Sequence, residues 1–302
     1  MDRRGFLKST LGLSAGIFAA QLALPGSVKC KMISPATDWI AKTYFDDIIK
    51  LKLNQFKKEN LALKIGETHC HSTFSDGTSS VKDIINRASY LGLDFLILTE
   101  HLMPDKYPLE FTLSSIHERW RCVQEWNSTQ YNPVKVYPAF EVSTNQGHLI
   151  LVLDEFYLQR KTFKDIIQQF SKFNTKMGSM EEVAKLVKPF GGITIIPHPE
   201  KEKSYPFGAS ISFIKNNLLG LVDAIEDIST GHGYKENYSS ELGLASIGSS
   251  DDHFNLIIGT TVTAYDSSKN NDFISAVKAK ETKAIKIDDS LREFIAAARL
   301  II

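Results

Sequence analysis

The stretch His69-Cys70-His71-Ser72-Thr73-Phe74-Ser75-Asp76-Gly77 sets two histidines around a cysteine, with a carboxylate on the glycine turn that follows. The residues before it, Leu61 to Gly66, are predicted to form a short strand, so His69 and His71 lie two positions apart at its end. Successive side chains of a strand point to opposite faces, so we expect both imidazoles on one face and Cys70 on the other. With Asp76 on the next turn, they form part of a metal coordination shell. A single His-x-His can arise by chance, so the rest of the chain decides.

The composition is that of an ordinary globular protein. The chain has 302 residues, with 35 Lys plus Arg balanced by 35 Asp plus Glu, which is enough for one large α/β domain with a substantial core. Because a long nucleic acid needs a basic face to displace its counterions, the neutral balance predicts no extended nucleic-acid partner. A small phosphorylated substrate stays compatible with it. No segment in the body of the chain is apolar for long enough to span a bilayer.

The first residues differ from the body of the chain. Asp2-Arg3-Arg4-Gly5-Phe6-Leu7-Lys8 leads into a weakly apolar run, Leu11 to Leu24. This pattern resembles a twin-arginine export signal, although Asp2 stands where Ser or Thr is usual. We expect residues 1–30 to be recognised by the twin-arginine export machinery, and the protein to reach the periplasm or cell surface. No small-x-small cleavage site is evident, so an uncleaved segment would tether the protein to the membrane. The alternative is a basic start to a cytoplasmic protein.

After this segment the pattern becomes that of one folded domain. Residues 37–60 carry apolar side chains at helical intervals and are predicted to form an amphipathic helix that packs on the domain or leads to it. From residue 61 to 302 strand and helix patterns alternate. Strands are expected at 94–99, 134–140, 148–153, 192–197, 221–228, 244–249, 257–264 and 283–287, and helices at 81–91, 113–129, 163–187 (broken near 177–178) and 270–280.

Alternating β and α units predict a largely parallel sheet. Seven or more strands in one body of this size favour a closed or distorted (β/α) barrel over an open doubly wound sheet. No GxGxxG or GxxxxGK[ST] follows a predicted strand, so neither a dinucleotide site nor a P-loop is supported.

Histidines and acids concentrate at the ends of the predicted strands. These positions are His69, His71 and Asp76, then Glu100-His101, Glu141 and His148, His198, and finally Asp251-Asp252-His253. Of the 8 histidines, only His117 and His232 lie elsewhere, a distribution that packing does not explain. The carboxyl-terminal face of a barrel is where its loops converge. Imidazoles and carboxylates without thiolate suit Zn, Mn or Fe, and divalent cations relieve the repulsion between crowded acids. We therefore predict a polynuclear metal site.

On these motifs the sequence resembles the polymerase and histidinol phosphatase (PHP) superfamily of metal-dependent phosphoesterases, over about residues 64 to 288. The resemblance rests on His-Cys-His-Ser-Thr-Phe-Ser-Asp-Gly, Thr-Glu-His, Glu-Val-Ser with Gly-His, Ile-Pro-His-Pro-Glu and Gly-Ser-Ser-Asp-Asp-His. It implies a distorted (β/α)7 barrel, related to the TIM barrel, that holds two to three divalent ions (Mn, Zn or Fe).

The resemblance also implies ligands. One ion would be held by His69, His71, Glu141 and Asp251; Glu141 would bridge to a second ion bound by His148 and His198; and Asp76, His101 and His253 would hold a third. Glu141, Asp251 and His253 are the catalytic candidates. The family often has Asp where this chain has Glu100. Asp252 is expected to support the ligands beside it.

The function implied is that of an exported metal-dependent phosphoesterase acting on a small phosphorylated molecule, a monoester or nucleotide. A hydroxide bridging two ions would attack, because the cations lower the pKa of bound water from about 15.7 toward about 7. The same ions would neutralise charge that develops on the phosphoryl group. His232, Lys201 and Lys203 are weak candidates for phosphate contacts; the simpler interpretation is that they are solvated loop residues, as His117 is expected to be on a helix surface.

Three alternatives stay open at this stage. A phosphotyrosine-protein phosphatase of the same superfamily would share the chemistry, and an aromatic-rimmed pocket would favour it. A non-catalytic metal-binding module would share the ligands, although such a module is expected to lose several of them. Hydrolysis of a carbon–nitrogen bond, as in related amidohydrolase barrels, is disfavoured because no lysine bridge follows a strand. The fold alone does not identify the substrate.

Overall fold

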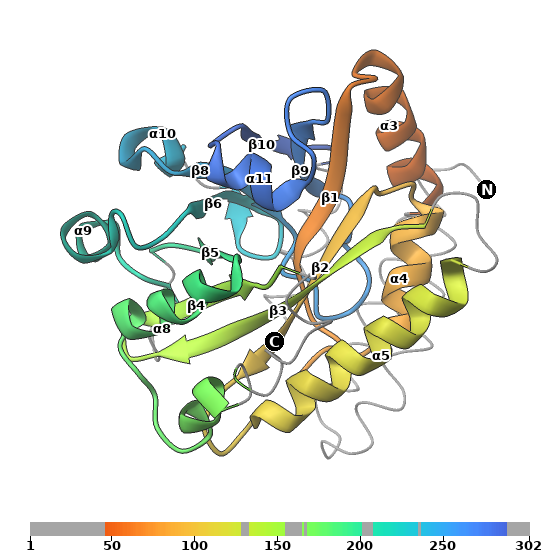
Figure 1. The fold of residues 1–302 in the computed structure, drawn as a ribbon. Helices are drawn as coiled ribbons and strands as arrows, with labels where there is room; N and C mark the ends of the chain where they lie inside the picture. Colours follow the sequence, from red (N-terminus) through yellow and green to blue (C-terminus); the bar gives the residue numbers. More distant parts are fainter. Residues whose placement is uncertain are drawn as a thin grey trace, which may run out of the picture.

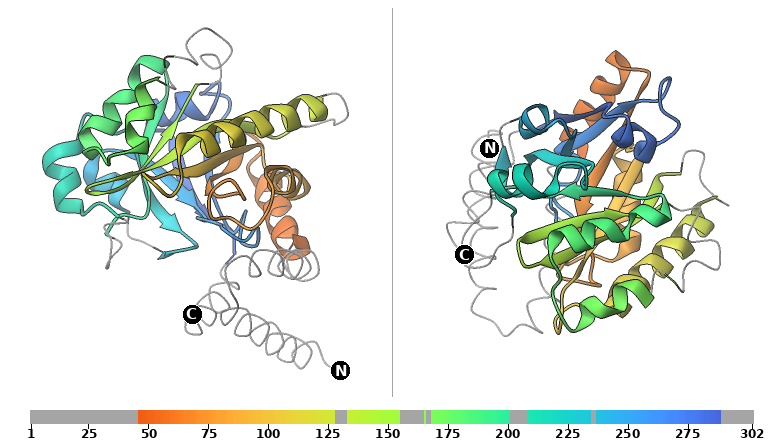
Figure 2. Two further views of the ribbon diagram at one scale, coloured as in Figure 1. Left: turned by 90° about the horizontal axis from the view of Figure 1, so that it is seen from below. Right: turned by 60° about the vertical axis from the view of Figure 1, so that its left-hand side comes forward.

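The computed structural model describes residues 46–127, 133–154, 165, 168–200, 208–234 and 237–288. The predicted export segment 1–30, the start of the predicted helix 37–60, and both Lys201 and Lys203 lie outside these residues. Within them one sheet of ten strands curls into a nearly closed barrel with helices around its outside (Figures 1 and 2). The strand order is β10-β9-β1-β2-β3-β4-β5-β6-β7, and β8 pairs with β6. The α/β barrel expected from the sequence is confirmed.

The strands are β1 Leu63–Cys70, β2 Phe95–Leu102, β3 Lys135–Thr144, β4 Gly147–Val152, β5 Ile193–Ile196, β6 Ala224–Ser229, β7 Gly233–Tyr234, β8 Ala245–Ser249, β9 Thr261–Asp266 and β10 Thr282–Lys286. The α-helices are α3 Asp46–Glu59, α4 Val81–Tyr90, α5 Leu109–Asn127, α8 Met180–Leu186, α9 Ile211–Phe213, α10 Tyr238–Leu242 and α11 Phe273–Lys278. Short helical turns lie at η2 Ser171–Asn174, η3 Lys188–Phe190 and η4 Ile214–Leu218. Most predicted elements are present with shifted ends, whereas β7, α9, η4 and α10 were not predicted. The strand expected at 257–264 begins later, at Thr261.

The expectation of a largely parallel sheet was wrong, because the sheet is mixed. β1, β2 and β3 run parallel to one another, as do β5, β6 and β8, but β4 is antiparallel to both its neighbours. β9 is antiparallel to β1 and to β10. The cause at β4 is local: Thr144 pairs with Gly147, so only two residues connect β3 to β4. A connection that short can only make a hairpin, since a parallel crossover needs a dozen or more residues.

The barrel closes between β8 and the β9–β10 pair through side-chain hydroxyls. Thr263 Oγ1 donates to Gly248 O and accepts from Gly248 N, at 2.9 and 3.0 Å. Thr282 Oγ1 donates to Ser246 O at 2.8 Å. A Cβ on Gly248 would lie 2.7 Å from Val262 O, so only glycine lets these strands approach. Threonines on β9 and β10 thus replace part of a backbone ladder.

The inside of the barrel is a packed core. The helix α11 closes the end at which the parallel strands begin, which we call the lower end; the end at which they finish is called the upper end. Apolar side chains from β2, β3, β4, β5, β6 and β8 form one cluster with Phe273, Ile274, Ala276 and Val277 of α11. The rings of Phe273 and Phe95 stack at 5.0 Å between centroids. Two further clusters lie between the sheet and the outer helices. The barrel therefore offers one open end for chemistry, as expected for this architecture.

The helix α3 packs against the outside of this body. Ile49 and Leu53 are fully buried in the same cluster as Leu91 and Ile258. Asp46 of α3 pairs with Arg87 of α4 at 2.8 Å, and Arg87 also donates to Leu256 O at 2.8 Å. The helix is thereby tied to α4 and to the loop before β9.

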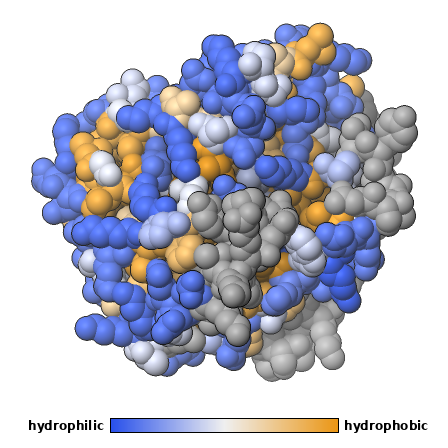
Figure 3. Space-filling view, viewed as in Figure 1, coloured by the Kyte–Doolittle hydropathy of each residue, from blue (hydrophilic) through white to orange (hydrophobic). Residues whose placement is uncertain are grey.

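The surface in the view of Figure 1 is mostly hydrophilic, with smaller hydrophobic areas between (Figure 3). Among the helices of the described residues, none combines the length and the apolar character needed to cross a bilayer.

We predict that Leu53→Ala lowers the free energy of unfolding by about 2–5 kcal/mol, because it leaves a cavity at a fully buried site. The matched control is Leu51→Ala on the same helix. Leu51 is 70% exposed, so its change is expected to stay within about 0.5 kcal/mol. Urea unfolding followed by circular dichroism measures both. Equal effects of the two substitutions would contradict the packing of α3 described above.

Candidate metal centre

On β2 and β3, every second side chain faces the inside of the barrel. These inward-facing side chains are apolar near the start of the strand and ionisable near its end. On β2, Phe95 and Ile97 enter the inner core and His101 follows on the same face. On β3, Tyr137 and Ala139 enter that core and Glu141 follows. The intervening side chains face the outer helices. One alternation thus fixes both the core and the direction of the site residues.

The first strand extends further than predicted, through Cys70, so His69 lies within it and His71 directly after it. As expected, the two histidines share a side: both Nε2 atoms approach Glu141 Oε2, at 3.4 and 3.3 Å. Cys70 lies on the other side, in the cluster formed with α3 and α4.

The direction of β4 decides where His148 lies. His148 is near the start of its strand, which in a parallel barrel would put it at the opposite end from Glu141. Because β4 runs antiparallel, His148 pairs with Ser143 at the upper end. Its Nδ1 lies 2.9 Å from Glu141 Oε1. The hairpin that overturned the expected sheet therefore brings His148 to the site.

Glu141 lies at the centre of the cluster and uses both oxygens. His148 Nδ1 and His198 Nε2 lie 2.9 and 3.1 Å from Oε1. On the other side, Oε2 faces His69 Nε2, His71 Nε2 and His101 Nδ1 at 3.4, 3.3 and 3.0 Å. Five imidazoles, carried by β1, β2, β4 and β5 or the residues just after them, therefore surround one carboxylate.

Two further carboxylates complete the arrangement. Asp251 Oδ1 lies 3.2 Å from His69 Nε2 and 3.3 Å from His71 Nε2. Asp76 approaches His101 Nε2 at 3.4 Å and His253 Nε2 at 3.2 Å. The nine side chains named as ligands from the sequence (His69, His71, Asp76, His101, Glu141, His148, His198, Asp251 and His253) are thus all gathered in one cluster.

Their donor atoms fit divalent ions. Four buried atoms that face one another around Glu141 have no hydrogen-bond partner among the described residues: His69 Nε2, His71 Nε2, His101 Nδ1 and Glu141 Oε2. Buried polar atoms without partners are costly, and all four face the same space. Donor atoms of the cluster lie within 4.8 Å of one another in four overlapping sets: His71, Asp76, His101 and His253; His69, His198 and Asp251; His69, His71 and Glu141; and His101, Glu141 and His148. Nitrogen and oxygen donors in such sets suit Zn, Mn or Fe.

Charges in the cluster are strongly coupled. Burial alone would raise the pKa of Glu141, but His148, His69 and His101 hold it well below its usual range. Burial disfavours a charged His69, yet Asp251, Glu141 and Glu226 outweigh burial and raise its pKa. His71 behaves oppositely, because burial and the neighbouring His253 and His101 lower its pKa to about 3. The cluster is thus an acidic centre that attracts protons or cations.

Two acids next to ligands support the site; the role of Asp252 was predicted, whereas that of Glu100 was not. Glu100 accepts hydrogen bonds from Ser72 Oγ, Ser75 Oγ and Ser115 Oγ at 2.5, 2.6 and 3.0 Å, and so holds the loop that carries Asp76. Asp252 accepts four backbone N–H groups from residues 254–258, at 2.7–3.0 Å, which supports the interpretation made of it. These bonds also explain why β9 starts late.

Two buried acids were missed altogether. Glu67 Oε1 accepts the N–H groups of His69 and Ser250 at 3.1 and 2.9 Å, and burial raises its pKa to about 7. Glu226 lies 2.8 Å from His69 Nδ1. The only signal in the sequence was an acid within a predicted strand, because the contacts of Glu67 with Ser250 and of Glu226 with His69 join residues that are distant along the chain.

His232 is not the solvated loop residue that the sequence favoured. Its Nε2 contacts Asp251 Oδ2, and its ring lies edge-on to His198 at 4.7 Å. His117 does lie on the exposed surface of α5.

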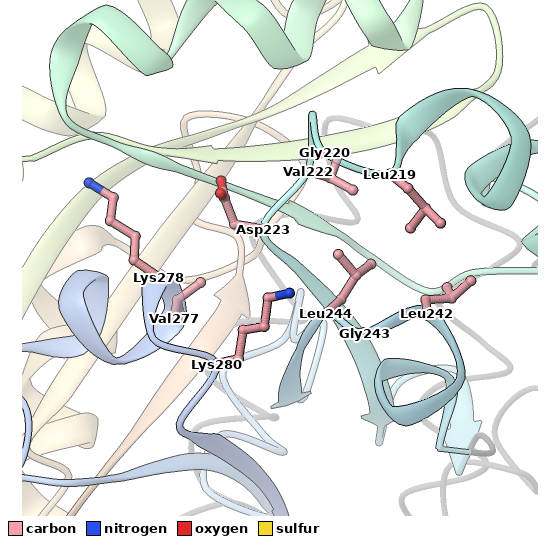
Figure 4. A pocket seen from close by; sticks show the side chains of 10 residues that line it. All are labelled: Leu219, Gly220, Val222, Asp223, Leu242, Gly243, Leu244, Val277, Lys278 and Lys280. Atoms are coloured by element: carbon pink, nitrogen blue, oxygen red, sulfur yellow. The ribbon is translucent and has the colours of Figure 1, made fainter.

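A pocket of about 450 Å³ lies away from this cluster, beside the amino-terminal ends of β6 and β8. Figure 4 shows leucine and valine side chains lining it, with Asp223, Lys278 and Lys280 supplying its charged groups. None of the nine clustered residues is among those that line it.

The fold and the cluster together give the class of this protein: an α/β barrel with a candidate metal centre of imidazoles and carboxylates at one end. Residues 67–286 match the model of the PHP domain family, and the chain belongs to that family. No curated protein sequence matches this chain. Among solved structures, the fold is similar to a two-domain protein from Bacteroides vulgatus that contains a predicted PHP-like metal-dependent phosphoesterase. The TM-score is 0.50 at 21% identity, covering 78% of this chain and 70% of that one. A complex of Endonuclease Q with a 27-mer duplex that carries an abasic lesion gives a TM-score of 0.49 at 14% identity, covering 73% and 58%.

We predict that metal affinity rises with pH. The carboxylates around His101 and His253 outweigh burial and raise their pKa values to about 10 and about 9, so both rings are protonated at pH 7 without metal. Each must lose its proton before that nitrogen can bind an ion. Between pH 6 and 8 the apparent Kd is expected to fall roughly tenfold per pH unit for each proton displaced.

Calorimetric titration with Mn²⁺ or Zn²⁺ in buffers of different ionisation enthalpy counts the released protons. His253→Gln should release one proton fewer than the wild type. Binding that releases no protons at pH 7 would contradict this prediction.

Proposed function

We propose that this PHP-domain protein is a metal-dependent phosphoesterase that hydrolyses a small phosphorylated molecule, a monoester or nucleotide. The observation that carries the proposal is the position of Glu141, with both carboxylate oxygens facing imidazoles in the cluster of nine candidate ligands. Family membership over residues 67–286 supports the same chemistry. The residues that would hold two to three ions are the nine of the cluster, with Mn, Zn or Fe as the metals their donors suit.

Ions held there would provide a water acidic enough to act as a nucleophile near neutral pH, and positive charge to neutralise the phosphoryl oxygens. In the reaction the ester P–O bond breaks, water adds to phosphorus, and the leaving oxygen takes a proton. The candidate ligands differ in how far their side chains are exposed to solvent, and this difference indicates their roles. The side chains of His69 and Glu141 are 0% and 1% exposed, whereas those of His253 and Asp76 are 26% and 34% exposed.

This difference gives the site a closed side and an open side. We infer that the substrate approaches past Asp76 and His253, because water reaches the cluster there. When two ions are bound and His253 holds none, His253 keeps its proton and is the histidine best placed to give it to the leaving group, whereas Glu141 and Asp251 position the ions. A small substrate is favoured over a polymer because the net charge of the chain is zero.

We predict that Glu141→Gln lowers phosphoesterase activity at least about 100-fold, since the central carboxylate loses its charge while keeping its shape. The test is a panel of phosphate monoesters, nucleotides, phosphotyrosine peptides and amides, assayed on protein loaded with Mn²⁺ or Zn²⁺. Glu110→Gln, at an exposed position on α5, is the matched control and should keep wild-type activity.

Turnover of a small phosphoester by the wild type and its loss in Glu141→Gln is the expected result. Equal activity in both proteins would remove the catalytic assignment. Preference for phosphotyrosine peptides would favour the protein phosphatase, preference for amides the carbon–nitrogen hydrolase, and metal binding without any turnover the binding module.

We also propose that the protein is exported by the twin-arginine machinery, on the basis of Arg3-Arg4 and the apolar run that follows. Replacing both arginines by lysine is expected to keep the protein in the cytoplasm, because that machinery reads the arginine pair. Cell fractionation measures the effect, with Lys8→Arg as the control. Export that is unaffected by loss of the pair would contradict the proposal.

A further inference from the structure

The β6–β7 hairpin supplies none of the nine candidate ligands, yet it touches three of them. Its strands are joined by residues 230–232, with Ser229 paired to Gly233. Glu226 on β6 contacts His69 and His198, and His232 in the turn contacts Asp251. The three ligands that the hairpin touches, His69, His198 and Asp251, form one of the sets whose donor atoms lie within 4.8 Å of one another. We call His69, His198 and Asp251 the inner group, and His71, Asp76, His101 and His253 the outer group.

Glu226 fixes two members of the inner group at once. It is fully buried, and its Oε1 lies 2.8 Å from His69 Nδ1. That contact lets Nδ1–H donate to the carboxylate and leaves Nε2 as the nitrogen for an ion. Its Oε2 accepts the backbone N–H of His198 at 2.7 Å, and Ser249 Oγ donates to Oε1 at 2.7 Å. One carboxylate thus sets a ring orientation and a backbone position.

His232 acts on the third member. Its Nε2 contacts Asp251 Oδ2, which leaves Oδ1 to face His69 and His71. The turn is held close because Gly231 N donates to Ser250 O at 2.7 Å. A Cβ on Gly231 would lie 2.5 Å from that same oxygen, so glycine is required for His232 to reach Asp251.

The inner group also contains the strained backbone of the site. Of the nine candidate ligands, only His198 and Asp251 have positive φ, at 29° and 51°. Residues other than glycine adopt this region reluctantly, and surrounding contacts must hold them there. Both are residues that the hairpin contacts. The outer group is supported from elsewhere, with Glu100 holding the loop of Asp76 and Asp252 holding the segment after His253.

We propose that the β6–β7 hairpin is a dedicated support for the inner group, in which Glu226 and His232 are positioning residues. They set the affinity for the ions that the inner group helps to hold, without changing the affinity for the ion held by Asp76, His101 and His253. The inference rests on the proposed metal-dependent function, because it assumes that the cluster binds ions. It goes further in assigning a separate structural support to part of the centre.

The test is titration of the full chain with Mn²⁺ or Zn²⁺ by calorimetry, with bound metal counted by mass spectrometry and no substrate present. Glu226→Gln and His232→Leu are expected to weaken the affinity for the ions held by the inner group 10- to 100-fold, the usual effect of removing a residue that orients a ligand. The ion held by Asp76, His101 and His253 should keep its wild-type affinity. His232→Gln, whose amide N–H still reaches Asp251, should retain most of the affinity.

Two comparisons make the result specific. Asp76→Asn is expected to weaken the affinity for the ion held by Asp76, His101 and His253, and to leave the affinity for the ions held by the inner group unchanged. His117→Leu, at the exposed histidine of α5, should change neither affinity. Circular dichroism verifies that each variant is folded, and His232→Leu carries the test alone should Glu226→Gln fail to fold.

Equal weakening of both affinities, or no rescue by His232→Gln, would show only a general structural role and overturn the inference. Unchanged binding in Glu226→Gln and His232→Leu would also overturn it, while leaving the proposed phosphoesterase intact. A wild-type chain that binds no metal at all would overturn both.

Discussion

The carboxylate of Glu141 is buried among five imidazoles, and the rest of the upper barrel is organised around that arrangement. An ionised carboxylate is costly to bury unless opposite charge or hydrogen bonds compensate it. Here both oxygens face ring nitrogens, and several of those nitrogens lack any other hydrogen bond among the described residues. Protons can satisfy such a cluster partly, and divalent cations can satisfy it more fully. The constraint explains why the acids and histidines lie together, since neither set would be tolerated alone.

The barrel separates this polar cluster from the apolar core by depth along the same strands. Phe95 and Ile97 pack low on β2, and His101 follows at the top of the same face. The helix α11 fills the lower end with Phe273. An imidazole cluster on a loosely packed floor would admit water from below and lose its coupling. The packed core therefore serves the site by keeping one side of it dry, as the 0% exposure of His69 shows.

The supporting residues form a second layer with its own logic. Serine hydroxyls and backbone N–H groups, rather than charged side chains, satisfy Glu100 and Asp252. Such bonds fix loops without adding charge to a site already rich in it. Glu226 and His232 extend the layer to the side where the backbone is strained. The support of the centre is thus divided among different elements of the fold.

The order of elements and the identity of the nine clustered side chains could be read from the sequence, because both depend on local signals. Apolar runs marked β2, β3 and β5, and histidines and acids stood next to their ends. Strand direction was misjudged at β4 even though its short connection to β3 was visible. The roles of Glu67, Glu226 and His232 depended on tertiary structure alone. The contacts of Glu67 with Ser250 and of Glu226 with His69 join residues far apart in sequence, and only the closed barrel brings them within hydrogen-bonding distance; His232 reaches Asp251 from a neighbouring loop. Local chemistry determined which groups this protein uses, and long-range packing decided which of them touch.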